Sequence, residues 1–152
     1  MNRAKIAEQY FLNGFACSQA VAMAFNDVVD VDIKTLEKIA LPFGGGLGRL
    51  RLTCGAISGM AMIIGALFTN DKPENKMEVY SITQQLALEF EKEYGTIICK
   101  DLLEIAHLKV EIAGKPEERN DQYYAKRPCA RIVYVAADIL EKYLIDRGII
   151  KE

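Results

Sequence analysis

The sequence lacks a surplus of positive charge and an export signal. Its 152 residues carry a formal net charge of −2, and acidic and basic side chains are interspersed along the chain. We therefore expect no basic face that would attract a nucleic-acid backbone, and we exclude nucleic-acid binding. Residues 1–10 contain no apolar stretch followed by a small-residue cleavage site, which favours a cytoplasmic protein.

Alternating strand patterns, internal repeats and low-complexity tracts are also missing. Apolar residues recur instead at spacings of three and four, which is the period of an α-helix. Asn2 and Asp32 stand where side chains cap helices, and Gly95 and Gly148 stand where helices end. We predict a single all-α domain over residues 1–152, a compact bundle of about six to seven helices with an exposed polar loop over residues 114–121.

The longest uncharged stretch runs from residue 52 to residue 70. Its length approaches that of a membrane span, but threonine, serine and asparagine side chains and three glycines dilute its apolar character. We therefore expect no membrane span. Residues from about 53 to 68 are predicted to form a helix that is apolar on nearly every face, which indicates a central helix surrounded by others.

Four cysteines are present, and no two of them are close in the sequence. Cys17, Cys54, Cys99 and Cys129 are separated by intervals of 37, 45 and 30 residues, so none belongs to a zinc-ribbon or thioredoxin-type pair. Each is predicted at or just before the start of a helix, where free N–H groups and the positive end of the helix dipole favour a thiolate. They can converge only after the whole chain has folded.

Cationic residues flank three of the four cysteines. They are Arg49 and Arg51 before Cys54, Lys100 after Cys99, and Lys126, Arg127 and Arg131 around Cys129. Positive charge near a thiol lowers its pKa and favours the thiolate, the form that attacks disulfides and binds metals. Cys17 has no such neighbour. The alternative is that the cysteines are small buried residues that only pack.

A glycine-rich segment, residues 43–49, precedes Cys54. Its backbone N–H groups suit an anion or another ligand ahead of a helix, or the segment is a tight turn that places Cys54. It contains no Gly-Lys-Ser/Thr sequence of a P-loop and follows no β-strand, so we favour the turn. The candidate residues for a ligand in this loop are Gly44, Gly45, Gly46, Gly48, Arg49 and Gly55.

Together these segments resemble a redox-active protein family whose four-cysteine signature is written C_GCAxxG_C_C. The resemblance covers roughly residues 13–133 and rests on the combined spacing of the motifs. The matching segments are Gly14-Phe15-Ala16-Cys17-Ser18-Gln19-Ala20-Val21, Phe43-Gly44-Gly45-Gly46-Leu47-Gly48-Arg49, Cys54-Gly55-Ala56-Ile57-Ser58-Gly59, Cys99 and Arg127-Pro128-Cys129. The resemblance implies a redox role for the cysteines, with a bound prosthetic group such as an iron–sulfur cluster, and implies no particular substrate.

Three functions fit the sequence. In the first, Cys54 attacks a disulfide, activated by the two preceding arginines, and one of the other three cysteines resolves the intermediate. In the second, the four thiolates bind an iron–sulfur cluster or a zinc ion. In the third, the protein is a helical interaction module with packed cysteines. We rank the first ahead of the second because the sequence shows activating charge and no metal-binding spacing. The sequence does not specify a redox partner or a small-molecule substrate, and it does not specify an oligomeric state.

Overall fold

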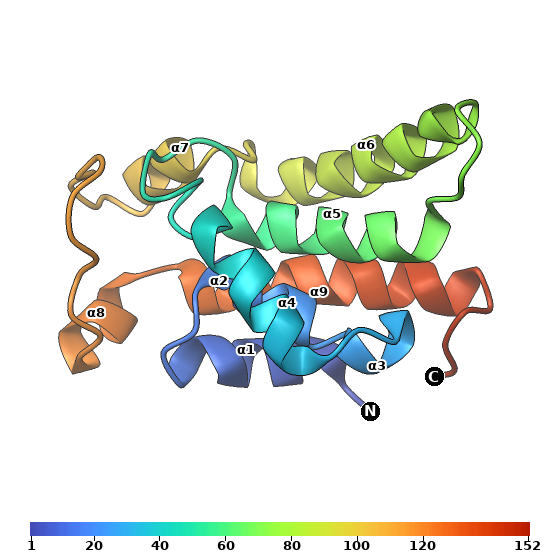
Figure 1. The fold of residues 1–152 in the computed structure, drawn as a ribbon. Coiled ribbons are helices and arrows are strands. Elements are labelled where there is room, and N and C mark those ends of the chain that lie inside the picture. The colour runs from blue at the N-terminus through green and yellow to red at the C-terminus, as the bar shows by residue number, and fades with distance from the viewer.

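The computed structural model describes all 152 residues and is built of helices joined by loops (Figure 1). There is no β-sheet, and the only β-type pairing is an isolated bridge between Thr53 and Ile98. The elements are α1 (Arg3–Leu12), α2 (Cys17–Met23), α3 (Asn26–Val29), α4 (Ile33–Ala40), the 3-10 helix η1 (Leu41–Phe43), α5 (Gly55–Phe68), α6 (Asn75–Tyr94), α7 (Cys99–Ile105), α8 (Asp121–Lys126) and α9 (Cys129–Asp146). The predicted all-α fold is confirmed.

The number of helices exceeds the expected six to seven because two short ones were not predicted. These are α3 and α8, which have four and six residues. Neither is long enough to show the apolar repeat by which the other helices are recognised. The polar side chain of Asn120 caps α8 by accepting a hydrogen bond of 2.9 Å from the backbone N–H of Tyr123. Local capping stabilises this short helix, together with the packing of Tyr123 and Tyr124 against Phe11.

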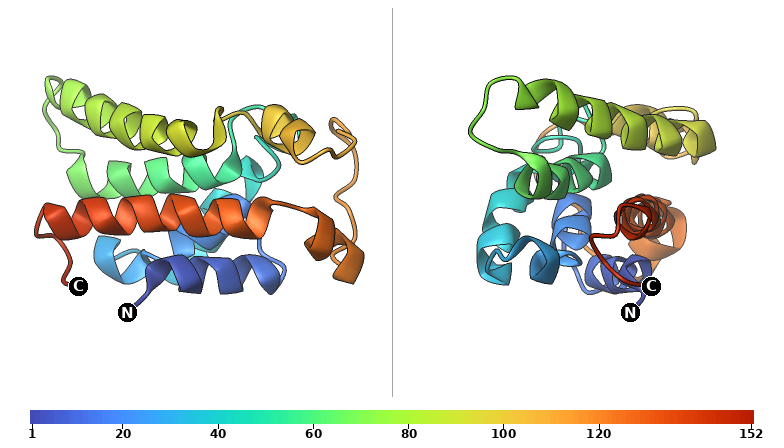
Figure 2. Two further views of the ribbon diagram at one scale, coloured as in Figure 1. Left: turned by 180° about the vertical axis from the view of Figure 1, so that it is seen from behind. Right: turned by 90° about the vertical axis from the view of Figure 1, so that its right-hand side faces the viewer.

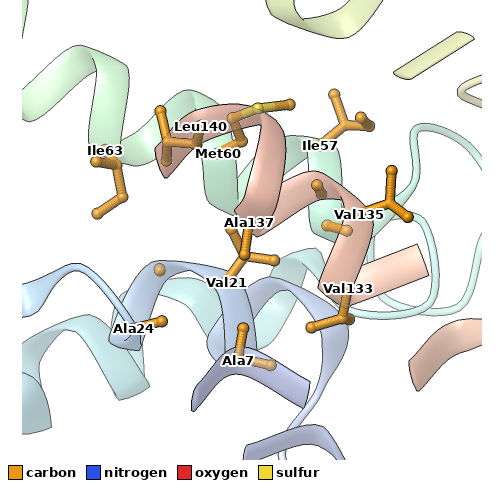
Figure 3. Close-up of a cluster of buried hydrophobic side chains, with 14 of the residues drawn as sticks. Ala7, Val21, Ala24, Ile57, Met60, Ile63, Val133, Val135, Ala137 and Leu140 are labelled. Carbon is orange, nitrogen blue, oxygen red and sulfur yellow. The ribbon is translucent and has the colours of Figure 1, made fainter. Parts of the chain in front are cut away.

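The hydrophobic core lies where α5 packs against α2 and α9, and where α9 packs along α1. Figure 3 shows side chains of these four helices meeting in the core, among them Ala7 of α1, Val21 of α2, Met60 of α5 and Ala137 of α9. Helix α6 covers the outer side of α5 (Figure 2). The predicted central helix is thus α5, which begins at Gly55 and buries seven of its 14 residues.

The chain runs back and forth along the bundle, and this path decides where the cysteines lie. Helix α1 runs toward one end, α2 starts there and runs back, and α4 returns to the same end, where the glycine-rich loop leads into α5 (Figure 1). Helix α6 returns once more and delivers the chain to α7, and α9 starts at that end as well (Figures 1 and 2). The N-termini of α2, α5, α7 and α9 therefore gather at one end of the molecule, opposite both chain termini.

No helix in the structure combines the length and the apolar character that crossing a bilayer requires. Even the most apolar helix, α5, has only 14 residues.

Candidate functional site

All four cysteines line one cavity of about 410 Å³ at the end of the bundle where these helices begin. Cys17, Cys99 and Cys129 are the first residues of α2, α7 and α9, and Cys54 is the N-cap of α5. The predicted placement at helix starts is confirmed. None of the four forms a disulfide.

The start of α2 is fixed by the polar residues that follow Cys17. The Gln19 side chain accepts a hydrogen bond of 2.9 Å from the backbone N–H of Ala16 and donates one of 2.8 Å to the carbonyl of Glu37 in α4. The Ser18 hydroxyl donates a bond of 2.7 Å to the carbonyl of Ala40. Buried polar groups in proteins are nearly always hydrogen-bonded. Here the bonds of Ser18 and Gln19 attach the cysteine-bearing end of α2 to α4.

The glycines of the Cys-Gly-Ala-x-x-Gly segment let α5 approach α2 closely. A Cβ atom at Gly59 would lie 2.6 Å from the carbonyl oxygen of Ser18, and one at Gly55 would lie 3.3 Å from the Cβ of Cys17. Non-bonded heavy atoms in proteins essentially never lie within 3.0 Å of a Cβ, so a side chain at Gly59 would force a shift. The motif therefore brings the start of α5, with Cys54, against the start of α2, with Cys17.

The glycine-rich loop follows a left-handed path that few sequences can adopt. Residues 45–49 all have positive φ, with values between 54° and 72°, and Arg51 has a φ of 62°. A Cβ at Gly46 would lie 2.7 Å from the Cβ of Cys99 and 2.6 Å from the backbone nitrogen of Leu52. Glycine has no Cβ, so it permits this close packing. The six residues predicted to hold a ligand in this loop all line the cavity, but a ligand there stays a prediction.

Cys17 and Cys129 are the two cysteines whose thiols influence each other most strongly. Side-chain hydrogen bonding between them lowers the pKa of Cys129 and raises that of Cys17. The Arg127 and Arg119 guanidinium groups lower the pKa of Cys129 further, in opposition to burial. Cys129 is therefore the cysteine that the surroundings favour as a thiolate.

The surroundings of Cys54 do not favour a thiolate, in contrast to its predicted role as the activated nucleophile. It is buried, and burial raises its pKa to about 12. Arg51, which the sequence predicted to activate Cys54, has a left-handed backbone, and its side chain contacts another cysteine. Nη1 of Arg51 donates a hydrogen bond of 3.7 Å to Sγ of Cys99. Burial still raises the pKa of Cys99, and this contact opposes the effect.

Three other cationic residues that flank cysteines in the sequence do not line the cysteine cavity in the structure. Lys100 pairs with Glu104 at 3.8 Å on the exposed side of α7, and Arg131 lies over the ring of Tyr134, with 4.9 Å from Cζ to the ring centroid. Lys126 is exposed and does not line the cavity. Of the cations flanking Cys129 in the sequence, only Arg127 faces the cavity.

Two charged residues of the site were missed by the sequence analysis, which placed residues 114–121 in an exposed loop. Glu117 and Arg119 belong to this segment and line the cavity. The Arg119 guanidinium donates hydrogen bonds to the carbonyls of Phe11 and Phe15 and lies 4.7 Å from the ring centroid of Tyr123. No signal in the sequence distinguishes Glu117 from the neighbouring Glu118, because its partners come from distant segments.

The cysteines do not form a metal cage in this structure. No three cysteine, histidine or acidic side chains come together closely enough to hold a metal ion. Tetrahedral Cys₄ coordination requires four sulfurs about 2.3 Å from one zinc ion. The four sulfurs are therefore not arranged as an assembled structural zinc site in this structure.

The fold and the site together define a class: a small all-α protein in which four unpaired cysteines from distant helix starts share one arginine-lined cavity. The chain belongs to the family described as "Putative redox-active protein (C_GCAxxG_C_C)", whose family model matches residues 15–143. The resemblance inferred from the motifs is thereby confirmed. Comparison with curated proteins and with solved structures finds no match to this chain.

Proposed function

We propose that the protein is a thiol–disulfide redox protein in which Cys129 and Cys17 cycle between a dithiol and a disulfide. The observation that supports this most directly is that the two cysteines begin α2 and α9 at one shared cavity, where their interaction lowers the pKa of Cys129 and raises that of Cys17. Such an interaction stabilises one thiolate at the expense of the other, so one sulfur attacks and the second resolves. This proposal replaces Cys54 with Cys129 as the nucleophile, because burial opposes ionisation of Cys54.

The proposed reaction has two exchange steps. The Cys129 thiolate attacks one sulfur of an external disulfide, which forms a mixed disulfide and releases one thiolate of the substrate. Cys17 then loses its proton to the released thiolate or to water and attacks the sulfur of Cys129. The second substrate thiolate leaves, and a Cys17–Cys129 disulfide remains. The substrate gains two electrons and the protein loses two.

The cytoplasmic location is part of the same proposal, because four unbonded cysteines suit a reducing compartment.

The proposal is tested by oxidising the protein with one equivalent of a small disulfide and mapping the cysteines by mass spectrometry. We expect loss of two of the four thiols and a single cross-link between the peptides of Cys17 and Cys129. The Cys54→Ser variant is the matched control and should give the same cross-link. A disulfide that contains Cys54, or four persistent thiols, would refute the assigned pair.

The same protein sample distinguishes the other two functions. Iron and acid-labile sulfide in an anaerobically purified sample, lost in each of the four Cys→Ser variants, would establish a cluster-binding protein. Four thiols that affect only stability, with neither metal nor disulfide formation, would establish packed cysteines in an interaction module. The structure favours neither result, because no three potential ligands come together and the interaction with Cys17 lowers the pKa of Cys129.

A further inference from the structure

Three arginines converge on a single carboxylate oxygen at the wall of the cysteine cavity. We call Arg49, Arg51 and Arg127 the arginine cluster. Oε1 of Glu117 lies 3.7 Å from Nη2 of Arg49 and 3.9 Å from Nη2 of Arg51, and it also accepts a hydrogen bond from Nη2 of Arg127. The three arginine side chains are only 12%, 6% and 8% exposed, whereas Glu117 is 39% exposed.

One carboxylate does not satisfy this cluster. The distances from Glu117 to Arg49 and Arg51 exceed those of a hydrogen bond, and buried Nη2 of Arg49 has no hydrogen-bond partner. Arg51 has other acceptors, the Glu111 carbonyl at 2.9 Å and Sγ of Cys99. With Arg119, the cavity wall carries four guanidinium groups against one carboxylate. Buried charges without partners are costly, so this surplus of cations favours the binding of an anion from outside the chain.

Glu117 shows which chemical group the cluster takes. It lies in the loop that joins α7 to α8, and it is the most exposed member of the charged group. Solvent therefore reaches the Glu117 carboxylate more readily than the three arginines. We propose that the arginine cluster binds a carboxylate of a small-molecule substrate, in the place that the Glu117 carboxylate takes in the structure.

The cluster also lies where such a substrate would meet the thiols. Arg51 contacts Cys99, Arg127 stands two residues before Cys129, and the cavity that all of them line has a volume of about 410 Å³. That volume lies within the range of small-molecule sites. The substrate class, which rests on the function proposed above, is therefore a small disulfide that carries carboxylates. Cys129 attacks its sulfur, and the cluster holds its carboxylate by charge-assisted hydrogen bonds.

Binding is tested without any redox step by using suberate, a dicarboxylate with the chain length of 3,3′-dithiodipropionate and no disulfide. At constant ionic strength we expect suberate to raise the Tm of the reduced protein, and 1,8-octanediol and sulfate to have little effect. Arg49→Gln or Arg127→Gln should weaken suberate binding about tenfold or more, because a charged hydrogen bond is lost. Glu117→Gln should strengthen it.

The control for these variants is Arg147→Gln, because Arg147 lies at the far end of α9 and contacts Tyr143. Arg49→Lys keeps a cation if Arg49→Gln does not fold, and it should retain part of the suberate effect. Equal stabilisation by sulfate and suberate would overturn the carboxylate assignment. No stabilisation by suberate, or one that Arg147→Gln removes equally, would overturn the site.

Reaction rates then separate this inference from the proposed function. We expect 3,3′-dithiodipropionate to oxidise the protein about tenfold faster than the neutral bis(2-hydroxyethyl) disulfide, with the ratio reduced toward one in Arg127→Gln. Equal rates for both disulfides would overturn the carboxylate site and leave the dithiol function intact. Suberate binding with no reaction of either disulfide would overturn the dithiol function and leave the site intact.

Discussion

Replacing Gly59 by alanine tests whether the close approach of α5 to α2 is needed. The new Cβ would lie 2.6 Å from the carbonyl oxygen of Ser18 and 3.1 Å from the Cβ of Val21. To restore ordinary van der Waals contact, the Ser18 oxygen would have to move by about 0.8 Å. Overpacking of this kind costs about 1–3 kcal/mol, and the better helix propensity of alanine returns about 1 kcal/mol. We expect Gly59→Ala to lower the free energy of unfolding by about 1 kcal/mol.

Gly65→Ala is the matched control, because it lies in the same helix and its Cβ would meet only Oγ1 of Thr69, at 4.0 Å. It gains helix propensity without a clash, so it should raise the free energy of unfolding by up to about 1 kcal/mol. The difference between the two variants, about 2 kcal/mol, isolates the helix contact. Urea denaturation followed by circular dichroism measures both. Equal stabilities would show that α2 and α5 tolerate a side chain between them, and the reasoning would fail.

Three further predictions concern titratable groups. Cys17→Ala removes the hydrogen bond that lowers the pKa of Cys129, so the pH profile of Cys129 alkylation by iodoacetamide should move to higher pH; an unchanged profile would contradict the pairing. Cys54, whose pKa burial raises to about 12, should stay unmodified in native protein at pH 8 and react in guanidinium chloride; native modification as fast as that of Cys129 would show that it is accessible. The hydrogen-bonded Arg3 guanidinium lowers the pKa of Asp27, so the stability it contributes is present above the unfolded-state pKa of about 4 and is lost as pH falls through the lower folded value. Asp27→Asn should remove this loss of stability at low pH from urea unfolding curves. The change in the free energy of unfolding should be less than about 1 kcal/mol, because Asp27 is half exposed. An unchanged pH dependence would mean that the pair contributes nothing.

Features that depend on neighbouring residues could be predicted from the sequence. The Asn2 and Asp32 side chains accept hydrogen bonds from backbone N–H groups three residues later, at 3.0 and 3.2 Å, as predicted for helix caps. Gly95 and Gly148 adopt positive φ where α6 and α9 end. Each of these arrangements involves only a few consecutive residues, so local residue preference decides it.

The charge environment of each cysteine could not be predicted in the same way. Arg51 is three residues from Cys54 in the sequence but contacts Cys99, because its positive φ redirects the side chain. Cys17 has no cation beside it in the sequence, yet it pairs with Cys129 and lies near Arg119. Proximity along the chain does not determine proximity in space when the backbone between the two residues is left-handed or when the partner lies in another helix.

The pairing of Cys17 with Cys129 links the second helix of the chain to its last one. A disulfide between them would close a loop of more than 100 residues, and cross-linking a loop of that size restricts the unfolded chain by about 4–5 kcal/mol. Under the proposed function, oxidation would therefore stabilise the fold, and the fold would stabilise the disulfide to the same extent, as linkage requires. The reduction potential of the folded protein, relative to that of the unfolded chain, would then measure the difference in free energy of unfolding between the oxidised and reduced forms. A substitution deep in the core that destabilises both forms equally would lower the Tm and leave that potential unchanged.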